Sequence, residues 1–265
     1  MKKAAQLTVE IFQKTARKTI RDRERSFYTK YFKSEQKDSC GTFTIIQNFN
    51  SLEIENDELH ILVHGWNSNL SSLSEIADKL DKEGKYFFAF NLPGHGDDNL
   101  SKSNVILAKE RLKFILKQFK RVKRINLISH SFGSSVVSFA LSELNIKVVK
   151  LVFLTSPNSL LELFYAFGNL LHLKQETLSY AAVIGSKLLS ESSKEANVSN
   201  KLASAKFDTL LIIHDEKDLI IPIKTAFEIK NQIENVKLSV YRDIGHYRML
   251  SNPSVVNEVA EFMRQ

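Results

Sequence analysis

Short apolar runs alternate with amphipathic helical patterns along most of this chain, and this alternation restricts the folds open to it. From residue 59 onwards, each run of strand length is followed by a segment with apolar residues at helical spacing. The expected strands are 59–65, 85–96, 125–130, 148–157, 208–218 and 236–246, and the expected helices are 72–84, 103–120, 132–144, 224–233 and 253–263. Apolar strands that alternate with helices form a mostly parallel sheet with helices on both faces. The predicted class is therefore α/β.

Two segments depart from this alternation. Residues 41–49 and 51–54 have the pattern of a hairpin at a sheet edge. Residues 158–206 contain a Leu- and Phe-rich helical stretch and then a polar connector, which we interpret as a helical cap over the carboxyl edge of the sheet. The apolar cap residues either line an acyl pocket or pack the cap onto the sheet. We expect one α/β domain over 41–265, with a helical cap at about 158–206.

Residues 1–40 form a basic leader ahead of this domain. The net charge of the chain is +7, and residues 1–37 hold 11 Lys and Arg against 4 Asp and Glu, while the remainder balances at 26 against 26. Apolar residues recur in the leader at a rough helical spacing, so we expect an amphipathic helix. This helix either packs on the domain with its basic face in solvent or contacts an anionic membrane surface or acidic partner. No nucleic-acid reading motif accompanies the charge, so we expect no nucleic-acid partner.

The composition and the distribution of charges also indicate the cellular compartment in which the protein is expected. The single cysteine, Cys40, excludes an internal disulfide. No apolar run reaches the roughly 18 residues of a membrane span. Charges at Glu10 and Lys14 interrupt any hydrophobic core of a signal peptide. We expect a cytoplasmic protein, and the sequence does not indicate an oligomeric state.

Around Ser131 a predicted strand changes into a helix within a few small residues. Such a turn lifts the Ser131 hydroxyl clear of the sheet and places the N–H of Phe132 at a helix N-terminus, where it can stabilise an oxyanion. The stretch Ser129-His130-Ser131-Phe132-Gly133 matches the G-x-S-x-G pattern of nucleophile turns, with Ser129 in place of the first glycine. The alternative interpretation is a serine-rich helix cap without a catalytic role.

Candidate partners for Ser131 follow two later strands. A serine nucleophile needs a base within hydrogen-bond reach and a carboxylate that orients the base. Asp215 and Asp218 come at the end of one predicted strand, and His246 comes at the end of the next. Asp243 is a third candidate carboxylate. Because the carboxyl ends of parallel strands meet at one edge, these side chains are expected near Ser131.

From about residue 41 to 265 the chain resembles the α/β-hydrolase superfamily. The stretches HGW, LPGHG, SHSFG, HDEKDLIIP and IGHYRML occur in the order of that family. The chain is most similar to small, poorly characterised bacterial serine hydrolases with HGW and GHSFG-type motifs. The resemblance implies an α/β-hydrolase fold with Ser131 as nucleophile, His246 as general base and Asp218 as the acid that orients it. Asp218 is favoured over Asp215 because it stands four residues before a proline, as the acid of the family does.

The same resemblance implies an oxyanion hole made by the backbone N–H groups of Trp66 and Phe132. It implies a serine hydrolase that cleaves a small-molecule carboxylic ester through an acyl-enzyme. The apolar cap residues, if they line an acyl pocket, favour an ester with a short or medium acyl chain. The alternatives are an acyltransferase or peptidase on the same triad, or a catalytically silent binding protein with a hydrolase fold.

Other polar residues near the motifs receive structural interpretations. We expect His64 to brace the oxyanion loop, His95 to shape a loop, and His130 to point away from the site. No cluster has metal-ligand spacing, and no nucleotide-binding motif occurs. We therefore expect neither a metal nor another cofactor.

Overall fold

The computed structural model describes residues 2–16, 20, 22–49, 58–189, 192 and 195–265. Its strands form one sheet in the order β1-β2-β4-β3-β5-β6-β7-β8. Strands β3 to β8 run parallel, and β1 and β2 join them antiparallel. The strands are β1 (Phe32–Asp38), β2 (Gly41–Gln47), β3 (Glu58–Val63), β4 (Tyr86–Phe90), β5 (Arg124–His130), β6 (Lys147–Leu154), β7 (Lys206–Asp215) and β8 (Val236–Tyr241). The predicted parallel sheet is confirmed.

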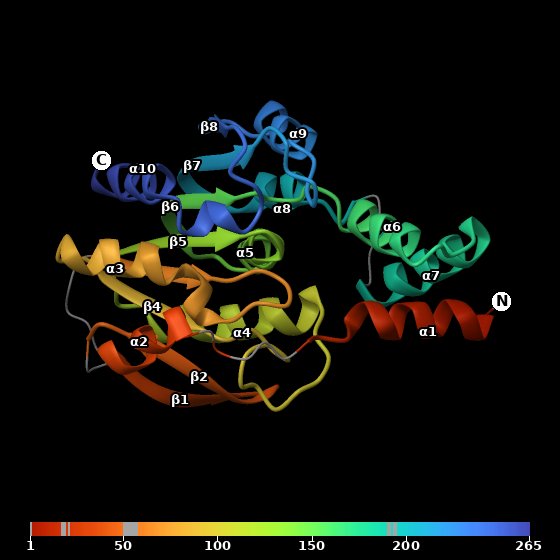
Figure 1. Cartoon of the computed structure of the whole chain (residues 1–265), viewed down its shortest axis with the longest axis horizontal. Coiled ribbons are helices and arrows are strands. Elements are labelled where there is room, and N and C mark those ends of the chain that lie inside the picture. Colours follow the sequence, from red (N-terminus) through yellow and green to blue (C-terminus); the bar gives the residue numbers. More distant parts are fainter. Residues whose placement is uncertain (1, 17–19, 21, 50–57, 190–191, 193–194) are drawn as a thin grey trace.

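Helices cover both faces of the sheet (Figure 1). The helices are α1 (Lys2–Gln13), α2 (Asp22–Lys30), α3 (Ser74–Lys82), α4 (Val105–Gln118), α5 (Phe132–Ser142), α6 (Leu160–Leu170), α7 (Gln175–Leu189), α8 (Val198–Ser204), α9 (Lys224–Gln232) and α10 (Pro253–Arg264). Short 3-10 helices span Leu70–Leu73 and Arg248–Leu250. None of the described helices is both long enough and apolar enough to cross a lipid bilayer.

Two hydrophobic cores lie on opposite faces of the sheet because successive strand side chains point to opposite sides. In β5, Leu127 enters the core shared with α4, α5, α8 and α9, and Ile128 enters the core shared with α3 and α10. Both side chains are fully buried. The strands therefore read as continuous apolar runs, as strands covered on both faces do.

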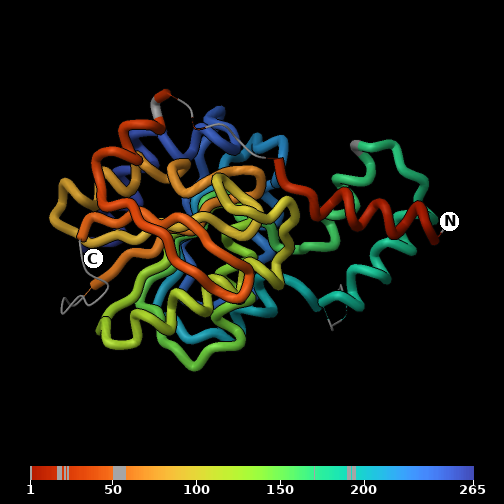
Figure 2. The backbone as a smooth tube through the Cα atoms, turned by 90° about the horizontal axis from the view of Figure 1, so that it is seen from below, coloured from red at the N-terminus to blue at the C-terminus, as the bar shows by residue number. Residues whose placement is uncertain are grey.

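Helices α1, α6 and α7 extend together beyond the carboxyl edge of the sheet (Figures 1 and 2). Ala5 and Val9 of α1 pack there against Phe164 of α6 and against Leu178 and Ala181 of α7. This packing accounts for the apolar side of the predicted leader helix. The first helix of the chain is thus part of the cap, while α8, also inside the segment predicted as cap, packs against α5 in the body.

The edge hairpin differs from the prediction in one of its strands. Strand β2 (41–47) pairs with β1 (32–38), whereas the predicted partner 51–54 lies outside the described residues. Residues 1–40 were predicted to be helical, but the structure places an edge strand at 32–38. Its sequence FKSEQKD contains no apolar run because most of β1 faces solvent. Charged residues also protect such an edge from pairing with another chain.

A buried arginine ties the hairpin to the loop that follows β4. Arg111 of α4 has no exposed surface, and its guanidinium Nε lies 2.7 Å from Asp38 Oδ2 at the end of β1. Its Nη1 lies 2.6 Å from Asp98 Oδ2 and 2.9 Å from the carbonyl oxygen of Asn91. The ring of Phe43 lies 4.2 Å below the guanidinium carbon. Removing the arginine would leave two carboxylates buried without their cation.

We predict that Arg111→Leu lowers the free energy of unfolding by about 3–5 kcal/mol, because breaking a buried ion pair strands the remaining charges. The matched control is Lys113→Met on the same helix. The Lys113 ammonium pairs with Glu110 and Glu143, whose side chains are 44% and 39% exposed. Exposed pairs contribute up to about 1 kcal/mol. Urea unfolding of both variants checks the difference, and equal losses would contradict the assignment.

Candidate active site

The turn between β5 and α5 holds Ser131 in a strained backbone conformation. Ser131 has φ 51° and ψ −121°, a region that residues with a Cβ rarely occupy. Its N–H donates to the carbonyl of Leu154 at the end of β6 (2.9 Å), and its own carbonyl accepts from the N–H of Ser134 (2.9 Å). These bonds hold the strained residue at the N-terminus of α5.

The sharpness of this turn depends on close approach between α5 and β3. A Cβ on Gly133 would lie 2.4 Å from the carbonyl oxygen of Val63 and 2.7 Å from that of His64. Only glycine fits there without a shift of the backbone. The serine at position 129 is tolerated because its buried hydroxyl bonds to the Ser134 hydroxyl (3.0 Å) and to the Val152 carbonyl (3.3 Å).

Asp218 and His246 form a buried hydrogen-bonded pair. The imidazole Nδ1 of His246 lies 2.7 Å from Asp218 Oδ2, and both residues are less than a tenth exposed. The other oxygen, Asp218 Oδ1, accepts from the N–H groups of Ile220 and Ile221 at 2.8 and 3.0 Å. Burial alone would raise the pKa of Asp218, but the hydrogen bonds from His246 and these amides outweigh it and lower that pKa. The carboxylate therefore stays ionised beside the imidazole.

The two other candidate carboxylates have different contacts. Asp215 Oδ2 accepts the N–H groups of Ile244 and Gly245 at 2.5 and 2.8 Å, so it holds the loop that carries His246. Burial opposes ionisation of Asp215, but these backbone bonds lower its pKa below the usual value. The side chain of Asp243 is 70% exposed and pairs with Lys217 (2.9 Å). Of the three carboxylates, Asp218 is the one that bonds to the His246 ring.

His64 braces the loop after β3, as predicted. Its Nδ1 bonds to the carbonyl of Gly65 (2.8 Å), and its Nε2 accepts the N–H of Leu92 in the loop after β4 (3.0 Å). Complete burial lowers the pKa of His64 well below its usual value, so the ring is neutral. The ring of His95 packs at 5.0 Å on Trp66, which joins the second loop to the same cluster.

The prediction that His130 points away from the site was wrong. Its ring centroid lies 4.7 Å from that of His246, and its Nε2 donates to the backbone carbonyl of His246 (3.2 Å). The loop that bears His246 packs against the end of β5, so the last side chain of that strand meets it. His130 is therefore a support for the position of His246.

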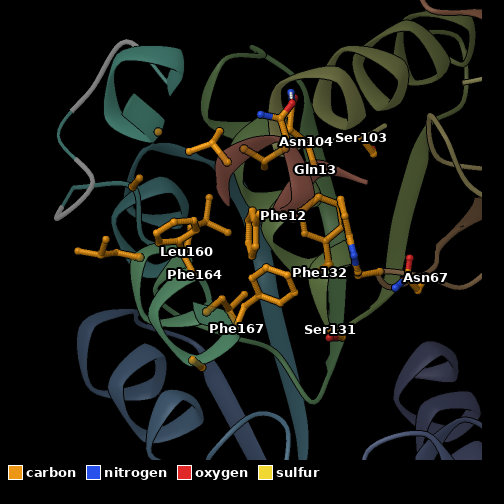
Figure 3. A pocket seen from close by; sticks show the side chains of 18 of the residues that line it. Phe12, Gln13, Asn67, Ser103, Asn104, Ser131, Phe132, Leu160, Phe164 and Phe167 are labelled. Atoms are coloured by element: carbon orange, nitrogen blue, oxygen red, sulfur yellow. Dashed lines mark hydrogen bonds between the residues drawn. The ribbon is translucent and has the colours of Figure 1, made fainter. Parts of the chain in front are cut away.

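Ser131 and His246 line one large cavity between the sheet edge and the cap. Its volume is about 750 Å³, and its walls are mainly apolar. Trp66 and Phe132, whose N–H groups were predicted to form an oxyanion hole, line the same cavity with their rings 5.0 Å apart. The cap contributes Leu160, Leu161, Leu163, Phe164 and Phe167. Leu160, Phe164 and Phe167 are labelled in Figure 3. The cap residues thus line a pocket, one of the two roles considered from the sequence.

Comparisons with known proteins agree with this architecture. A family model described as the alpha/beta hydrolase fold matches residues 61–182. The structure of an esterase from Pyrococcus furiosus, Pf2001, superposes with a TM-score of 0.70 at 21% identity and covers 95% of this chain and 96% of that one. This chain has the α/β-hydrolase fold.

Three further proteins are similar to this chain. Est1E from Butyrivibrio proteoclasticus superposes with a TM-score of 0.67 at 18% identity, over 87% of this chain and 97% of Est1E. A Mycoplasma genitalium protein named "Putative esterase/lipase 2" is 23% identical over 235 residues, which cover 77% of this chain and 88% of that protein. Its namesake in Mycoplasma pneumoniae is 29% identical over 102 residues, 37% of each chain.

Sequence reasoning missed one wall of the α/β-hydrolase cavity. Val9, Phe12 and Gln13 of α1 line it, although they stand more than a hundred residues before Ser131 in the chain. The one sequence signal for these residues was the rough amphipathic spacing of the leader. Such spacing indicates that one face of a helix is buried, but it does not identify the elements that cover this face. Figure 3 shows Phe12 between the cap side chains and Phe132.

The close approach at the α/β-hydrolase turn predicts that Gly133→Ala lowers the free energy of unfolding by about 3 kcal/mol or more, since the added methyl overlaps two carbonyl oxygens. Gly185→Ala on α7 is the control, because a Cβ there meets no atom within 4 Å. Alanine favours a helix over glycine by about 1 kcal/mol, so that variant should be as stable as the native protein or more so. Denaturant unfolding of both variants measures this, and a tolerated Gly133→Ala would contradict the geometry.

Proposed function

We propose that this protein hydrolyses carboxylic esters by two-step acyl transfer. In this proposal Ser131 is the nucleophile, His246 is the general base, and Asp218 orients the imidazole and stabilises its cation. The backbone N–H groups of Trp66 and Phe132 are assigned to the oxyanion. The observation that carries the proposal is the hydrogen bond of His246 to Asp218, together with the cavity that His246 and Ser131 both line.

The first step is attack of the Ser131 oxygen on the ester carbonyl carbon. The bond from His246 Nδ1 to Asp218 places the ring proton on Nδ1, which leaves Nε2 to accept the serine proton. The oxyanion that forms is stabilised by the two backbone donors, each worth about 3 kcal/mol of barrier in comparable sites. His246 then returns its proton to the leaving alkoxide, and the alcohol departs.

The second step releases the acyl group. Water enters the place of the alcohol, His246 removes its proton, and the resulting hydroxide attacks the acyl carbonyl. Collapse of the second oxyanion breaks the bond to Ser131, whose oxygen takes the proton back from His246, and a carboxylic acid is released. The apolar cavity suits an acyl chain because each buried methylene contributes about 0.8 kcal/mol.

Relatives support the choice of an ester over other acyl compounds. The Pyrococcus furiosus structure is named an esterase, and one Est1E structure contains ferulic acid. The mycoplasma relatives carry the name esterase/lipase. The same catalytic groups also serve acyltransferases and peptidases, so alcohol and amine acceptors added to the ester assay distinguish those reactions from hydrolysis.

We predict that a fluorophosphonate probe labels the native protein and that Ser131→Ala abolishes both the labelling and the hydrolysis of p-nitrophenyl esters. The Ser131 oxygen attacks the phosphorus of the probe and displaces fluoride, so removing this oxygen removes both the labelling and the hydrolysis. Ser129→Ala, which removes a neighbouring hydroxyl outside the proposed mechanism, is the control and should still be labelled. A native protein that resists the probe would instead favour the silent binding protein.

We predict that Asp218→Asn lowers kcat roughly a thousandfold to ten-thousandfold, because an amide does not hold the imidazole in the productive tautomer. Asp243→Asn should change kcat less than about twofold, since that exposed carboxylate pairs with Lys217. Initial rates with one ester substrate test both variants. If the loss followed Asp243 instead, the assignment of Asp218 would be wrong.

A further inference from the structure

The N-terminal helix is built into the candidate active site by bonds at its carboxyl end. The N–H of Ala16, just after α1, donates to the side-chain oxygen of Asn67 (2.8 Å), the neighbour of Trp66. The carbonyl of Gln13 accepts from the N–H of Ser103 (2.8 Å), and the N–H of Thr15 donates to the carbonyl of Ser101 (3.2 Å). The end of α1 is therefore fastened to two loops at the sheet edge.

Phe12, near the carboxyl end of α1, contacts both Trp66 and the cap. Its ring stacks on Trp66, with centroids 6.3 Å apart and planes inclined by 16°. It also contacts the rings of Phe164 and Phe167 in the cap edge-on, at 5.2 and 5.3 Å. In Figure 3 the Phe12 ring lies between the cap side chains and the side of the cavity that carries Phe132 and Ser131.

The size and lining of the cavity indicate what it holds. A volume of about 750 Å³ lies high in the range of small-molecule pockets, and an acetyl group would leave most of it empty. Apolar side chains from α1, α6 and α7 dominate its walls, so an unbranched hydrocarbon chain needs no polar partner there. The Phe12 ring lies in this cavity between Trp66 and the cap residues Phe164 and Phe167.

We infer that α1 is a wall of the acyl site and that Phe12 sets the length of the acyl chain, the substrates being esters of medium to long straight-chain fatty acids. This inference rests on the proposed function for the reaction itself. The binding of the chain is a property of the cavity and is measurable without catalysis.

The test measures binding of straight-chain fatty acids from butanoate to dodecanoate, below their critical micelle concentrations. Trp66 is the single tryptophan of the chain, so its fluorescence reports binding beside Phe12. Calorimetry measures the same series of Kd values without depending on Trp66 fluorescence. In the native protein Kd should fall about fourfold per added methylene and then level off where the chain meets the wall.

Phe12→Ala should move the levelling point to longer acids and improve the dodecanoate-to-octanoate affinity ratio roughly tenfold or more, as several methylenes fill the space of the ring. Phe12→Leu should give an intermediate shift while keeping α1 packed. Leu7→Ala, on the same helix but 55% exposed and outside the cavity lining, should match the native protein. The ratio within one variant is independent of the fraction of folded protein.

Two results would overturn the inference: a Kd that does not depend on chain length in the native protein, or the same levelling point in native protein and both Phe12 variants. Failure of the proposed function has a different signature. If binding depended on chain length but the fluorophosphonate did not label the protein, the proposed esterase activity would be wrong and the role of Phe12 in the acyl site would stand. If the Phe12 variants were labelled and hydrolysed esters but bound fatty acids with an unaltered dependence on chain length, only the inference about Phe12 would be wrong.

Discussion

The contact between the start of α5 and the end of β3 is the constraint on which the candidate site depends. Gly133 brings the helix within contact of two backbone carbonyls, and this proximity forces the turn that leaves Ser131 at a positive φ. A strained residue persists only where its surroundings fix it. Here the bond from Ser131 N–H to Leu154 and the packed strand on either side do so. The result is a hydroxyl held at the carboxyl edge of the sheet, where the loops after β7 and β8 also lie.

Two aspartates fix the position of the His246 imidazole through different contacts. Asp215 binds backbone N–H groups and so determines the path of the loop, whereas Asp218 binds the ring and determines its orientation. Both oxygens of Asp215 accept backbone N–H groups, whereas Asp218 binds backbone N–H groups through Oδ1 and keeps Oδ2 for the ring. His130 adds a third support through the carbonyl of His246. The imidazole is thus held by contacts from two strand ends.

The elements that could be predicted from the sequence are those with a strong local signal, such as an apolar run or a cluster of small residues at a turn. The six parallel strands follow from their apolar runs, and the turn at Ser131 follows from the small residues between a strand and a helix. Strand β1 was not predicted because an exposed, charged edge strand has no apolar signature. The place of α1 was not predicted because helical spacing shows that a face is buried, while its partners in α6 and α7 are determined by tertiary packing alone.

The long separation in sequence between α1 and its packing partners has a consequence for biosynthesis. Its packing partners Leu178 and Ala181 leave the ribosome about 170 residues after it, roughly ten to thirty seconds later at ordinary rates of translation. During that interval the apolar face with Val9 and Phe12 has no cap to cover it. The cavity can be completed only after α6 and α7 have been synthesised and have packed against α1.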